Sequence, residues 1–257
     1  MPIFLMLSKS LIRSFDTFVF DLDGTFWWYP KIVDGAKEIY RKLKEMNKKI
    51  VFVSNFSILD RDGMIRLLKK NGVPVAKDEI ITSSYVASKV LKGKKVFPIG
   101  NGLEKELRKG GVKIVKNEEC NIVVVGHDMN FNYKKASIAL KILLRRNAKL
   151  YTTAYGKLWI FKDNLLPGTG LITSSLEYCS GKKAIMLGKP SKFMLEEIRK
   201  IVEGKVIYFG DEDEADIGFA NEAGFFSVFI RNGVEKRISK NRPKATLKSL
   251  KHLLRFL

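Results

Sequence analysis

The stretch FVFDLDGTFWWYP, residues 18–30, is an apolar, strand-like run that ends in two acidic residues followed by Gly24. Residues i and i+2 of a strand point to the same side of a sheet, so Asp21 and Asp23 are expected to project together. Ligands of open α/β sheets bind at the carboxyl ends of strands, which is where this pair lies. Carboxylates so close raise each other's pKa unless a cation neutralises them. The stretch therefore predicts a site for Mg²⁺, which prefers oxygen ligands, or else a plain acidic turn closed by Gly24.

Similar strands alternate with helical patterns along the chain. TFVFDL (17–22) and KIVFVS (49–54) are each followed by a segment with apolar residues at helical spacing, and the alternation returns from the strand KKAIML (182–187) onward. Strands rich in Val, Ile and Phe, without polar alternation, indicate a parallel sheet covered by helices on both faces. The middle of the chain, from about Thr82 to Gly181, has the same character. We therefore predict an α/β fold.

The composition limits the partners and the location. The 257 residues carry a formal net charge of +20, which fits nucleic acid, acidic lipid or a phosphorylated small molecule as partner and does not choose among them. The basic residues are scattered along helical stretches, as is typical of solvated helix faces. Cys120 and Cys179 are too few and too far apart for a disulfide framework, so a reducing cytoplasm is predicted.

The C-terminal segment LKSLKHLLRFL (247–257) is basic and amphipathic. Such a helix could lie on a membrane surface. We favour instead a helix that closes the core with Leu247, Leu250 and Leu254, and therefore expect no membrane partner.

A second acidic group follows another apolar strand in YFGDEDEADIG (208–218). Its acidic residues include Asp211, Asp213, Glu214 and Asp216. Two acidic strand ends in one parallel sheet can share a cation, and we favour this interpretation over a solvated acidic loop because the rest of the chain is so basic.

Two further segments fit an anion. Ser54 and Asn55 end a strand with a hydroxyl and an amide donor, both able to hold a phosphate oxygen. In LGKPS (187–191), Lys189 follows a strand and can offset phosphate charge, while Pro190 can start a helix. Each segment alone is ordinary turn chemistry.

The order of these four segments along the chain, and the contexts in which they occur, resemble those of a known protein family. DLDGT (21–25), Ser54, Lys189 and GDEDEAD (210–216) are similar to the four motifs of the haloacid dehalogenase (HAD) superfamily of phosphatases. GHDMNFNYKKASIAL (126–140), the segment from 165 to 191, and NGV (232–234) resemble its subfamily IIA, the nitrophenylphosphatase and phosphoglycolate phosphatase type.

The resemblance implies a domain organisation that composition does not mark. It implies a Rossmann-like core domain of residues 1–82 and 182–257, interrupted by an α/β cap domain of residues 83–181. Homodimers held together by the cap occur in this branch, so the resemblance leaves a homodimer open.

The resemblance also implies a mechanism. Asp21 would be the nucleophile that forms an aspartyl-phosphate, and Asp23 would protonate the leaving alcohol and then activate water. The Mg²⁺ ligands would be the Asp21 side chain, the Asp23 main-chain carbonyl and the Asp211 side chain, with Asp216 orienting waters or Lys189.

Two groups of residues would then face the substrate. Ser54, the Asn55 amide and Lys189 would hold the transferring phosphoryl group. The candidates for substrate specificity are His127, Asp128 and Tyr155, although a buried structural histidine remains an alternative for the first of them.

The chain departs from many relatives at one place in the cap. Where these relatives carry Asn-x-Asp, it reads TTAYGKLWI (152–160), and Tyr155 and Lys157 are the candidates to replace the missing contact. Trp27, Trp28 and Tyr29 are expected either to form a lid wall or to pack against the cap.

We therefore expect an Mg²⁺-dependent phosphatase acting on a small phosphorylated metabolite, with no membrane or nucleic-acid partner. The alternative is a basic nucleic-acid-binding protein that keeps the fold without turnover.

Overall fold

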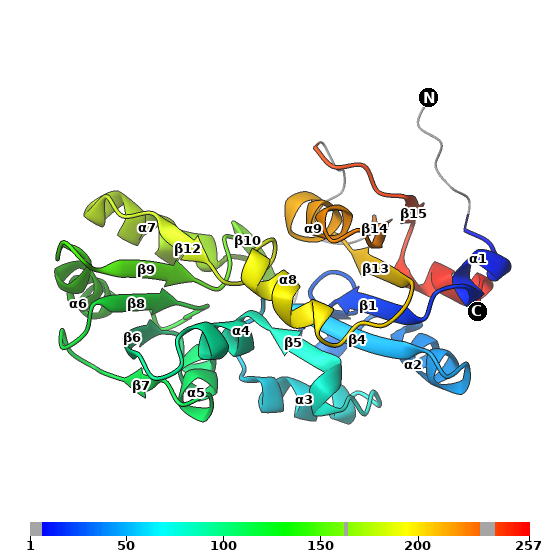
Figure 1. Cartoon of the computed structure of the whole chain (residues 1–257), viewed down its shortest axis with the longest axis horizontal. Helices are drawn as coiled ribbons and strands as arrows, with labels where there is room; N and C mark the ends of the chain where they lie inside the picture. The colour runs from blue at the N-terminus through cyan, green and yellow to red at the C-terminus, as the bar shows by residue number, and fades with distance from the viewer. Residues whose placement is uncertain (1–6, 162–163, 232–239) are drawn as a thin grey trace.

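The computed structural model describes residues 7–161, 164–231 and 240–257. These residues form two lobes that lie side by side along the long axis of the molecule, each built around a large parallel sheet (Figure 1). The first lobe takes strands from both ends of the chain, and the second takes strands from its middle. The predicted α/β fold with a parallel sheet is confirmed.

The sheet of the first lobe is parallel throughout, with β1 near its centre. In spatial order its strands are β15 (Ala245–Leu247), β14 (Phe226–Ile230), β13 (Val206–Gly210), β1 (Thr17–Asp21), β4 (Lys49–Ser54) and β5 (Ile80–Thr82). Every residue of β1 is buried, with Phe18 and Phe20 in one hydrophobic core and Val19 in another. Because both faces are buried, the strand has no polar alternation.

Helices cover both faces of this sheet. The face with Phe18 is covered by α1 (Lys9–Arg13), α2 (Ala36–Glu45), α3 (Arg61–Lys70) and η3 (Leu250–Arg255), and the other face by α4 (Ser83–Val90), α8 (Lys192–Arg199) and α9 (Phe219–Glu222). In α2 the buried residues Ile39 and Leu43 fall at helical spacing, which is the pattern expected from the sequence. The helix α8 begins after Ser191, whose side chain accepts a hydrogen bond from the Met194 N–H, and not at Pro190.

The sheet of the second lobe is also parallel. Its strands are, in order, β12 (Ala184–Met186), β9 (Lys149–Thr152), β8 (Ile122–Val125), β6 (Lys95–Ile99) and β7 (Lys113–Ile114). One face is covered by α6 (Tyr133–Leu143) and α7 (Thr169–Ser180), and the other by α5 (Asn101–Lys109) together with α4.

The strand expected over 182–187 lies in the second sheet, although the resemblance implied that residues 182–257 belong to the core domain. β12 pairs with β9, with Ala184 opposite Leu150, so it is an edge strand of the second sheet. A short apolar run does not say which sheet it joins, because its partner lies far away in the sequence. The predicted boundaries of the cap domain, at 82/83 and 181/182, remain predictions. The helix α4, which begins at the first of these boundaries, packs against both lobes: Val86 lies in a core of the first lobe and Ala87 in a core of the second.

Two small antiparallel hairpins and two short helical turns complete the described fold. The hairpins are β2 (Trp27–Trp28) with β3 (Lys31–Ile32) and β10 (Leu158–Phe161) with β11 (Asn164–Pro167); the turns are η1 (Lys77–Glu79) and η2 (Asp213–Gly218). The hairpin β10–β11 leaves the second lobe and buries Trp159 in a core of the first. It is therefore a direct connection between the lobes.

The C-terminal segment closes the first lobe, but not as the helix that we expected. Leu247 ends the edge strand β15, and Leu250 and Leu253 are buried by the short helical turn η3, whereas Leu254 is only partly buried. Leu254 nevertheless packs against the same core, as predicted, and Leu253 is the more deeply buried of the two because a tight turn has a shorter period than an α-helix. No helix within the described ranges combines the length and the apolar character that crossing a membrane requires.

Candidate active site

The carboxyl ends of three neighbouring strands meet at one edge of the first sheet. β1 ends at Asp21, β4 ends at Ser54, and β13 is followed directly by Asp211. The loop between β12 and α8 brings Lys189 to the same edge, where its Nζ lies 2.6 Å from Asp21 Oδ1. Segments that are far apart in the sequence thus meet where the sequence predicted a ligand site.

Lys189 is the centre of this group. Its Nζ also lies 2.5 Å from Asp216 Oδ1, and its side chain is only 2% exposed. Burial disfavours the charged ammonium, but the carboxylates of Asp21 and Asp216 outweigh it and raise the pKa of Lys189 well above its usual value. The lysine is therefore held as a cation.

The carboxylates outnumber the ammonium. Asp21, Asp211 and Asp216 are all buried, and each offers an oxygen within 4.8 Å of the others. Burial raises the pKa of Asp21 well above its usual value, and the neighbouring carboxylates of Asp216 and Asp211 raise it further, against the effect of Lys189. With Lys189 counted and all three carboxyl groups ionised, the cluster would have an excess of two negative charges, which is the charge that a divalent cation would neutralise.

The donor set fits such a cation. Asp21 Oδ2 is buried and has no hydrogen-bond partner within the described chain, so one oxygen of the cluster is left for a ligand. The side-chain atoms of the cluster that could bind a cation are carboxylate oxygens, which are the type of ligand that Mg²⁺ prefers. Gly24 leaves the space beside Asp211 open, since a Cβ on Gly24 would lie 2.2 Å from Asp211 Oδ2.

Gly24→Ala tests this close approach. Gly24 has φ +83°, and Gly224 has φ +78° with nothing within 4 Å of a built Cβ. Gly224→Ala is expected to lose only the backbone term of about 1–2 kcal/mol, whereas Gly24→Ala should lose roughly 1–3 kcal/mol more from overpacking against Asp211. Urea unfolding of the two variants measures the difference. Equal losses would contradict the close packing of Gly24 on Asp211.

Asp216 is placed to orient its neighbours. Its Oδ1 accepts hydrogen bonds from Lys189 Nζ and, at 2.8 Å, from the Tyr208 hydroxyl. Its Oδ2 accepts from the N–H groups of Asp211 and Glu212, each at 3.0 Å. Both oxygens of Asp216 are thus occupied by protein donors, and its role in orienting waters or Lys189 stays a prediction.

Sequence reasoning missed Tyr208 and Thr25. The fully buried Tyr208 hydroxyl also receives a hydrogen bond from Lys189, at 3.1 Å. Thr25 Oγ1 donates to Asp211 Oδ1 at 3.0 Å. The sequence carries a signal for Thr25, since it lies within DLDGT, whereas Tyr208 looks like any other apolar residue of its strand.

Ser54 and Asn55 lie beside Lys189. Ser54 Oγ accepts a hydrogen bond from the Phe56 N–H at 3.0 Å, so its own proton remains available for a ligand. The Asn55 side chain donates to the Lys189 carbonyl at 3.0 Å and accepts from the Lys189 N–H at 2.8 Å. The Asn55 side chain therefore fixes the Lys189 main chain, and a phosphate contact of Asn55 would use its main-chain N–H.

Asp23 lies beside Trp27, with which it forms a β-bridge. It is partly exposed by surface area but densely surrounded by protein atoms, and this burial raises its pKa to about 6. The N–H groups of Trp27 and, to a smaller extent, Trp159 lower that pKa by hydrogen bonding, as does the charge of Lys189. Both indole nitrogens are buried, and neither meets the geometry of a hydrogen bond within the described chain. Such a pKa suits a group that gives and takes a proton near neutral pH.

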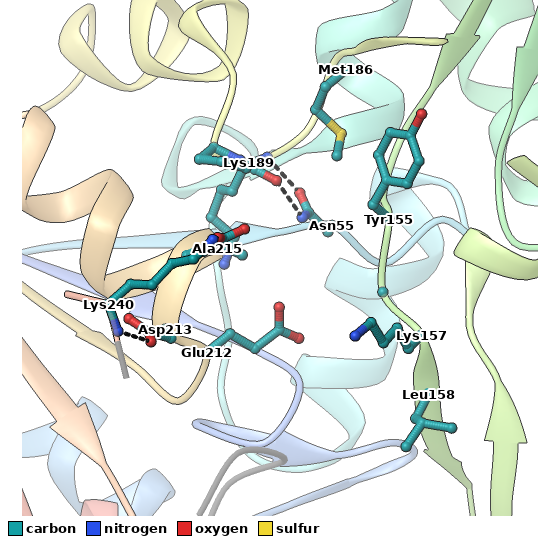
Figure 2. A pocket seen from close by; sticks show the side chains of 13 residues that line it. Asn55, Tyr155, Lys157, Leu158, Met186, Lys189, Glu212, Asp213, Ala215 and Lys240 are labelled. Atoms are coloured by element: carbon teal, nitrogen blue, oxygen red, sulfur yellow. Dashed lines mark hydrogen bonds and ion pairs between the residues drawn. The ribbon is translucent and has the colours of Figure 1, made fainter. Parts of the chain in front are cut away.

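A cleft of about 810 Å³ opens between the lobes above this cluster. Its walls come from Tyr155–Leu158 in the second lobe, from the loop with Lys189, and from residues 212–215 and Lys240 in the first lobe (Figure 2). Lys157 points its ammonium into the cleft from the second lobe, opposite Glu212. The cleft is large enough for a small organic molecule.

The three cap residues predicted for specificity lie in different places. Tyr155 lines the cleft, but its hydroxyl is hydrogen-bonded to Glu177. His127 packs its ring on Trp159, 4.7 Å between ring centroids, and Asp128 is buried in an ion pair with Lys135. Of the three, Tyr155 is the residue that contacts the cleft, and a role in specificity stays a prediction for all of them.

The other predicted residues also have definite positions. Asp213 accepts hydrogen bonds from the main-chain N–H groups of Lys240 and Asn241, and Glu214 pairs with the Lys240 ammonium, so both hold residues 240–241. Trp27 is fully buried and packs on Phe56 of the first lobe, whereas Tyr29 packs on Trp159 of the hairpin β10–β11. The segment NGV, 232–234, lies outside the described residues.

Comparisons with known proteins agree with the geometry. A sequence model of a family described as haloacid dehalogenase-like hydrolase matches residues 18–113, and one described as HAD-hydrolase-like matches residues 186–253. A 4-nitrophenylphosphatase of Schizosaccharomyces pombe is 30% identical over 260 residues, which cover 89% of this chain and 87% of that protein.

Solved structures give the same result. A p-nitrophenyl phosphatase from Archaeoglobus fulgidus superposes with a TM-score of 0.85 at 28% identity, covering 95% of this chain and 100% of the other. The glycerol phosphate phosphatase from Mycobacterium tuberculosis, solved in complex with magnesium, has a TM-score of 0.84, at 23% identity over 96% of this chain and 78% of the other. At that identity the likeness concerns the fold. The comparisons give no support to a nucleic-acid-binding protein without turnover.

Proposed function

Because the chain belongs to the haloacid dehalogenase-like hydrolases, in the subfamily IIA branch that resembles 4-nitrophenylphosphatases, we propose that it hydrolyses small phosphate monoesters with the help of Mg²⁺. The observation that carries the proposal is the buried cluster of Asp21, Lys189, Asp211 and Asp216 beneath the cleft. The names of the relatives support a phosphatase, and the cluster supplies the groups that such a reaction needs.

The reaction has two steps, and Asp21 and Asp23 carry both. A carboxylate oxygen of Asp21 attacks phosphorus, the bond from phosphorus to the ester oxygen breaks, and Asp23 gives its proton to the departing alcohol. In the second step, Asp23 takes a proton from a water molecule, which attacks the aspartyl-phosphate and restores the Asp21 carboxylate with release of inorganic phosphate. A pKa of Asp23 near 6 supports both proton transfers.

Mg²⁺ would be held by the Asp21 and Asp211 side chains and the Asp23 main-chain carbonyl. When bound, it would neutralise charge on the cluster and on the transferring phosphoryl group. Two observations support this assignment: Asp21 Oδ2 has no hydrogen-bond partner among the described residues, and carboxylates outnumber ammonium groups in the cluster.

The phosphoryl group would be bound by Ser54, the Asn55 main-chain N–H and Lys189. Lys189 lies within ion-pair distance of the attacking carboxylate, so it can contact the phosphoryl oxygens during transfer. Asp216 and Tyr208 keep its ammonium in place.

The second lobe would act as the cap domain and choose the substrate. We propose that the cap extends from about residue 83 to the end of β12, since β12 belongs to the second sheet. A small phosphorylated metabolite fits the cleft, with Tyr155 and Lys157 on its cap side. The cytoplasmic location and a homodimer stay predictions.

A phosphate-release assay tests the proposal. We expect release of phosphate from 4-nitrophenyl phosphate and from members of a metabolite panel in Mg²⁺, loss of release in EDTA, and recovery when Mg²⁺ is returned. Salt-sensitive binding of DNA or RNA with no phosphate release from any ester would contradict the proposal and favour the nucleic-acid-binding alternative.

A further inference from the structure

The loop that follows β4, residues 55–60, is held from the second lobe. Ser57 is completely buried, and its hydroxyl oxygen accepts hydrogen bonds from the His127 N–H at 2.8 Å and from the Thr153 hydroxyl at 3.3 Å. His127 comes two residues after the end of β8, and Thr153 directly follows β9. Two neighbouring strands of the second sheet thus end beside one side chain of the first lobe.

The interface around Ser57 is closely packed. A Cβ on Gly102, in α5 of the second lobe, would lie 2.3 Å from the Ile58 carbonyl oxygen. A Cβ on Gly126 would lie 3.1 Å from Ser57 Oγ. The two glycines therefore let the main chain of the second lobe approach the loop closely, and the hydrogen bonds to Ser57 lie inside this interface.

The same loop belongs to the proposed phosphate site. Asn55 lies two residues before Ser57, and its side chain holds the Lys189 main chain through two hydrogen bonds. Thr153 lies close to this pair as well, because a Cβ on Gly188 would be 2.1 Å from the Thr153 carbonyl oxygen and 2.3 Å from Asn55 Oδ1. The end of β9 thus packs against both segments that lead to the phosphate site.

We propose that Ser57 is a positioning residue, through which the second lobe fixes the loop that carries Ser54 and Asn55. Residues that do not contact the phosphate thereby set how tightly it is bound. The inference rests on the proposed function, in which this loop and Lys189 hold the phosphoryl group. It adds a dependence of phosphate binding on a hydrogen-bonded contact between the lobes.

The affinity for inorganic phosphate separates positioning from stability. Inorganic phosphate is a product of the proposed reaction and contacts the same loop. A variant that is merely less stable binds phosphate like the wild type as long as it remains folded. A variant whose loop has lost its fixed geometry binds phosphate more weakly, since ordering the loop then opposes binding.

Ser57→Ala removes the acceptor that the His127 N–H and the Thr153 hydroxyl share. Both donors are then left without it inside the interface. We expect the Kd of inorganic phosphate, measured by isothermal titration calorimetry in Mg²⁺, to rise about 10-fold, as is typical when buried donors lose their acceptor. The ratio kcat/KM for 4-nitrophenyl phosphate should fall by a similar factor.

Ser227→Ala is the matched control. Ser227 is also completely buried, and its hydroxyl donates to Asn221 Oδ1 at 2.7 Å and accepts from the Lys244 N–H at 3.2 Å. Both of its partners belong to the first lobe. This variant should lose stability in urea and keep the wild-type Kd for phosphate.

Thr153→Val tests the same contact from the second lobe. It removes the hydroxyl donor and leaves Ser57 with the His127 N–H. The Kd of phosphate should rise about 2- to 5-fold, which corresponds to one neutral hydrogen bond. The double variant Ser57→Ala/Thr153→Val should bind phosphate no more weakly than Ser57→Ala, because the two changes remove the same contact.

The outcomes distinguish the inference from its premise. A wild-type Kd in folded Ser57→Ala, an equal loss in Ser227→Ala, or losses that add in the double variant would overturn the positioning role and leave the phosphatase in place. If Ser57→Ala does not fold, a wild-type Kd in Thr153→Val overturns that role. A wild-type protein that neither binds phosphate nor releases it from an ester would overturn the proposed function and the inference with it.

Discussion

Asp21→Asn is expected to lower phosphate release by roughly 10⁴-fold or more, the loss typical of removing a nucleophile that acts together with its partners. The amide is uncharged and has a much weaker nucleophile in place of the carboxylate oxygen. It also removes an ion-pair partner of Lys189, whose Nζ lies 2.6 Å from Asp21 Oδ1. The loss should be in kcat, because the remaining phosphate contacts are unchanged.

The matched control is Asp16→Asn, the same chemical change at an exposed position. Asp16 is exposed, precedes β1, and accepts a hydrogen bond from the Lys205 N–H through a side-chain oxygen that Asn would keep. Asp16→Asn should therefore retain wild-type activity.

A second measurement tests covalency. Each protein is incubated with an ester that is labelled in its phosphoryl group, and the reaction is stopped with acid. The wild-type protein should then carry bound label, and Asp21→Asn should carry none. Turnover at the wild-type rate in Asp21→Asn would refute the assignment of the nucleophile.

The sequence predicted the acidic edge of the sheet because the relevant signals are local. Asp21 and Asp211 each follow an unbroken apolar run, and the carboxyl ends of parallel neighbours must meet. The same locality explains the correct bounds of β4, which the sequence placed at 49–54. Structural features that depend on a few consecutive residues could therefore be predicted from the sequence.

The missed features depend on contacts between distant segments. β12 looked like a strand of the first lobe, but its pairing with β9 is decided by tertiary contacts. Tyr208 is one of several large apolar residues in its strand, and its hydroxyl matters only because Lys189 and Asp216 arrive beside it. Trp159 likewise lies in an aromatic and apolar run, and the place where this run packs depends on the position of the hairpin β10–β11. No pattern within these runs carries that information.

Lys189→Met is expected to cost about 3–5 kcal/mol of folding free energy near neutral pH in EDTA, because it leaves buried carboxylates without their cation. Asp21 and Asp216 are 5% and 1% exposed, so water cannot replace the ammonium. Phosphate release should also fall by roughly 10²- to 10³-fold, as expected when a preorganised electrostatic contact is removed.

The control is Lys240→Met, which removes another ammonium from the same cleft. Lys240 pairs with Glu214, but the side chains of both residues are largely exposed, so water screens the pair and the stability should change little. Urea unfolding in EDTA compares the two variants. A loss no larger for Lys189→Met than for Lys240→Met would contradict the view that this ammonium holds the cluster together.

The loss in Lys189→Met should depend on pH with a definite sign. The pKa of Asp21 is raised in the folded state by burial and by the carboxylates of Asp216, Asp211 and Asp23, and removing Lys189 takes away what opposes this rise. A carboxyl group with a raised folded pKa binds more protons in the folded than in the unfolded protein, so it penalises folding as pH rises above the unfolded value of about 3.9. The gap in stability between wild type and Lys189→Met should therefore narrow from pH 7.5 toward pH 5, measured by urea unfolding in EDTA. A difference in stability that stays constant or widens as the pH falls would mean that uncompensated negative charge does not destabilise the variant. The electrostatic argument for a divalent cation at this edge of the sheet would then fail.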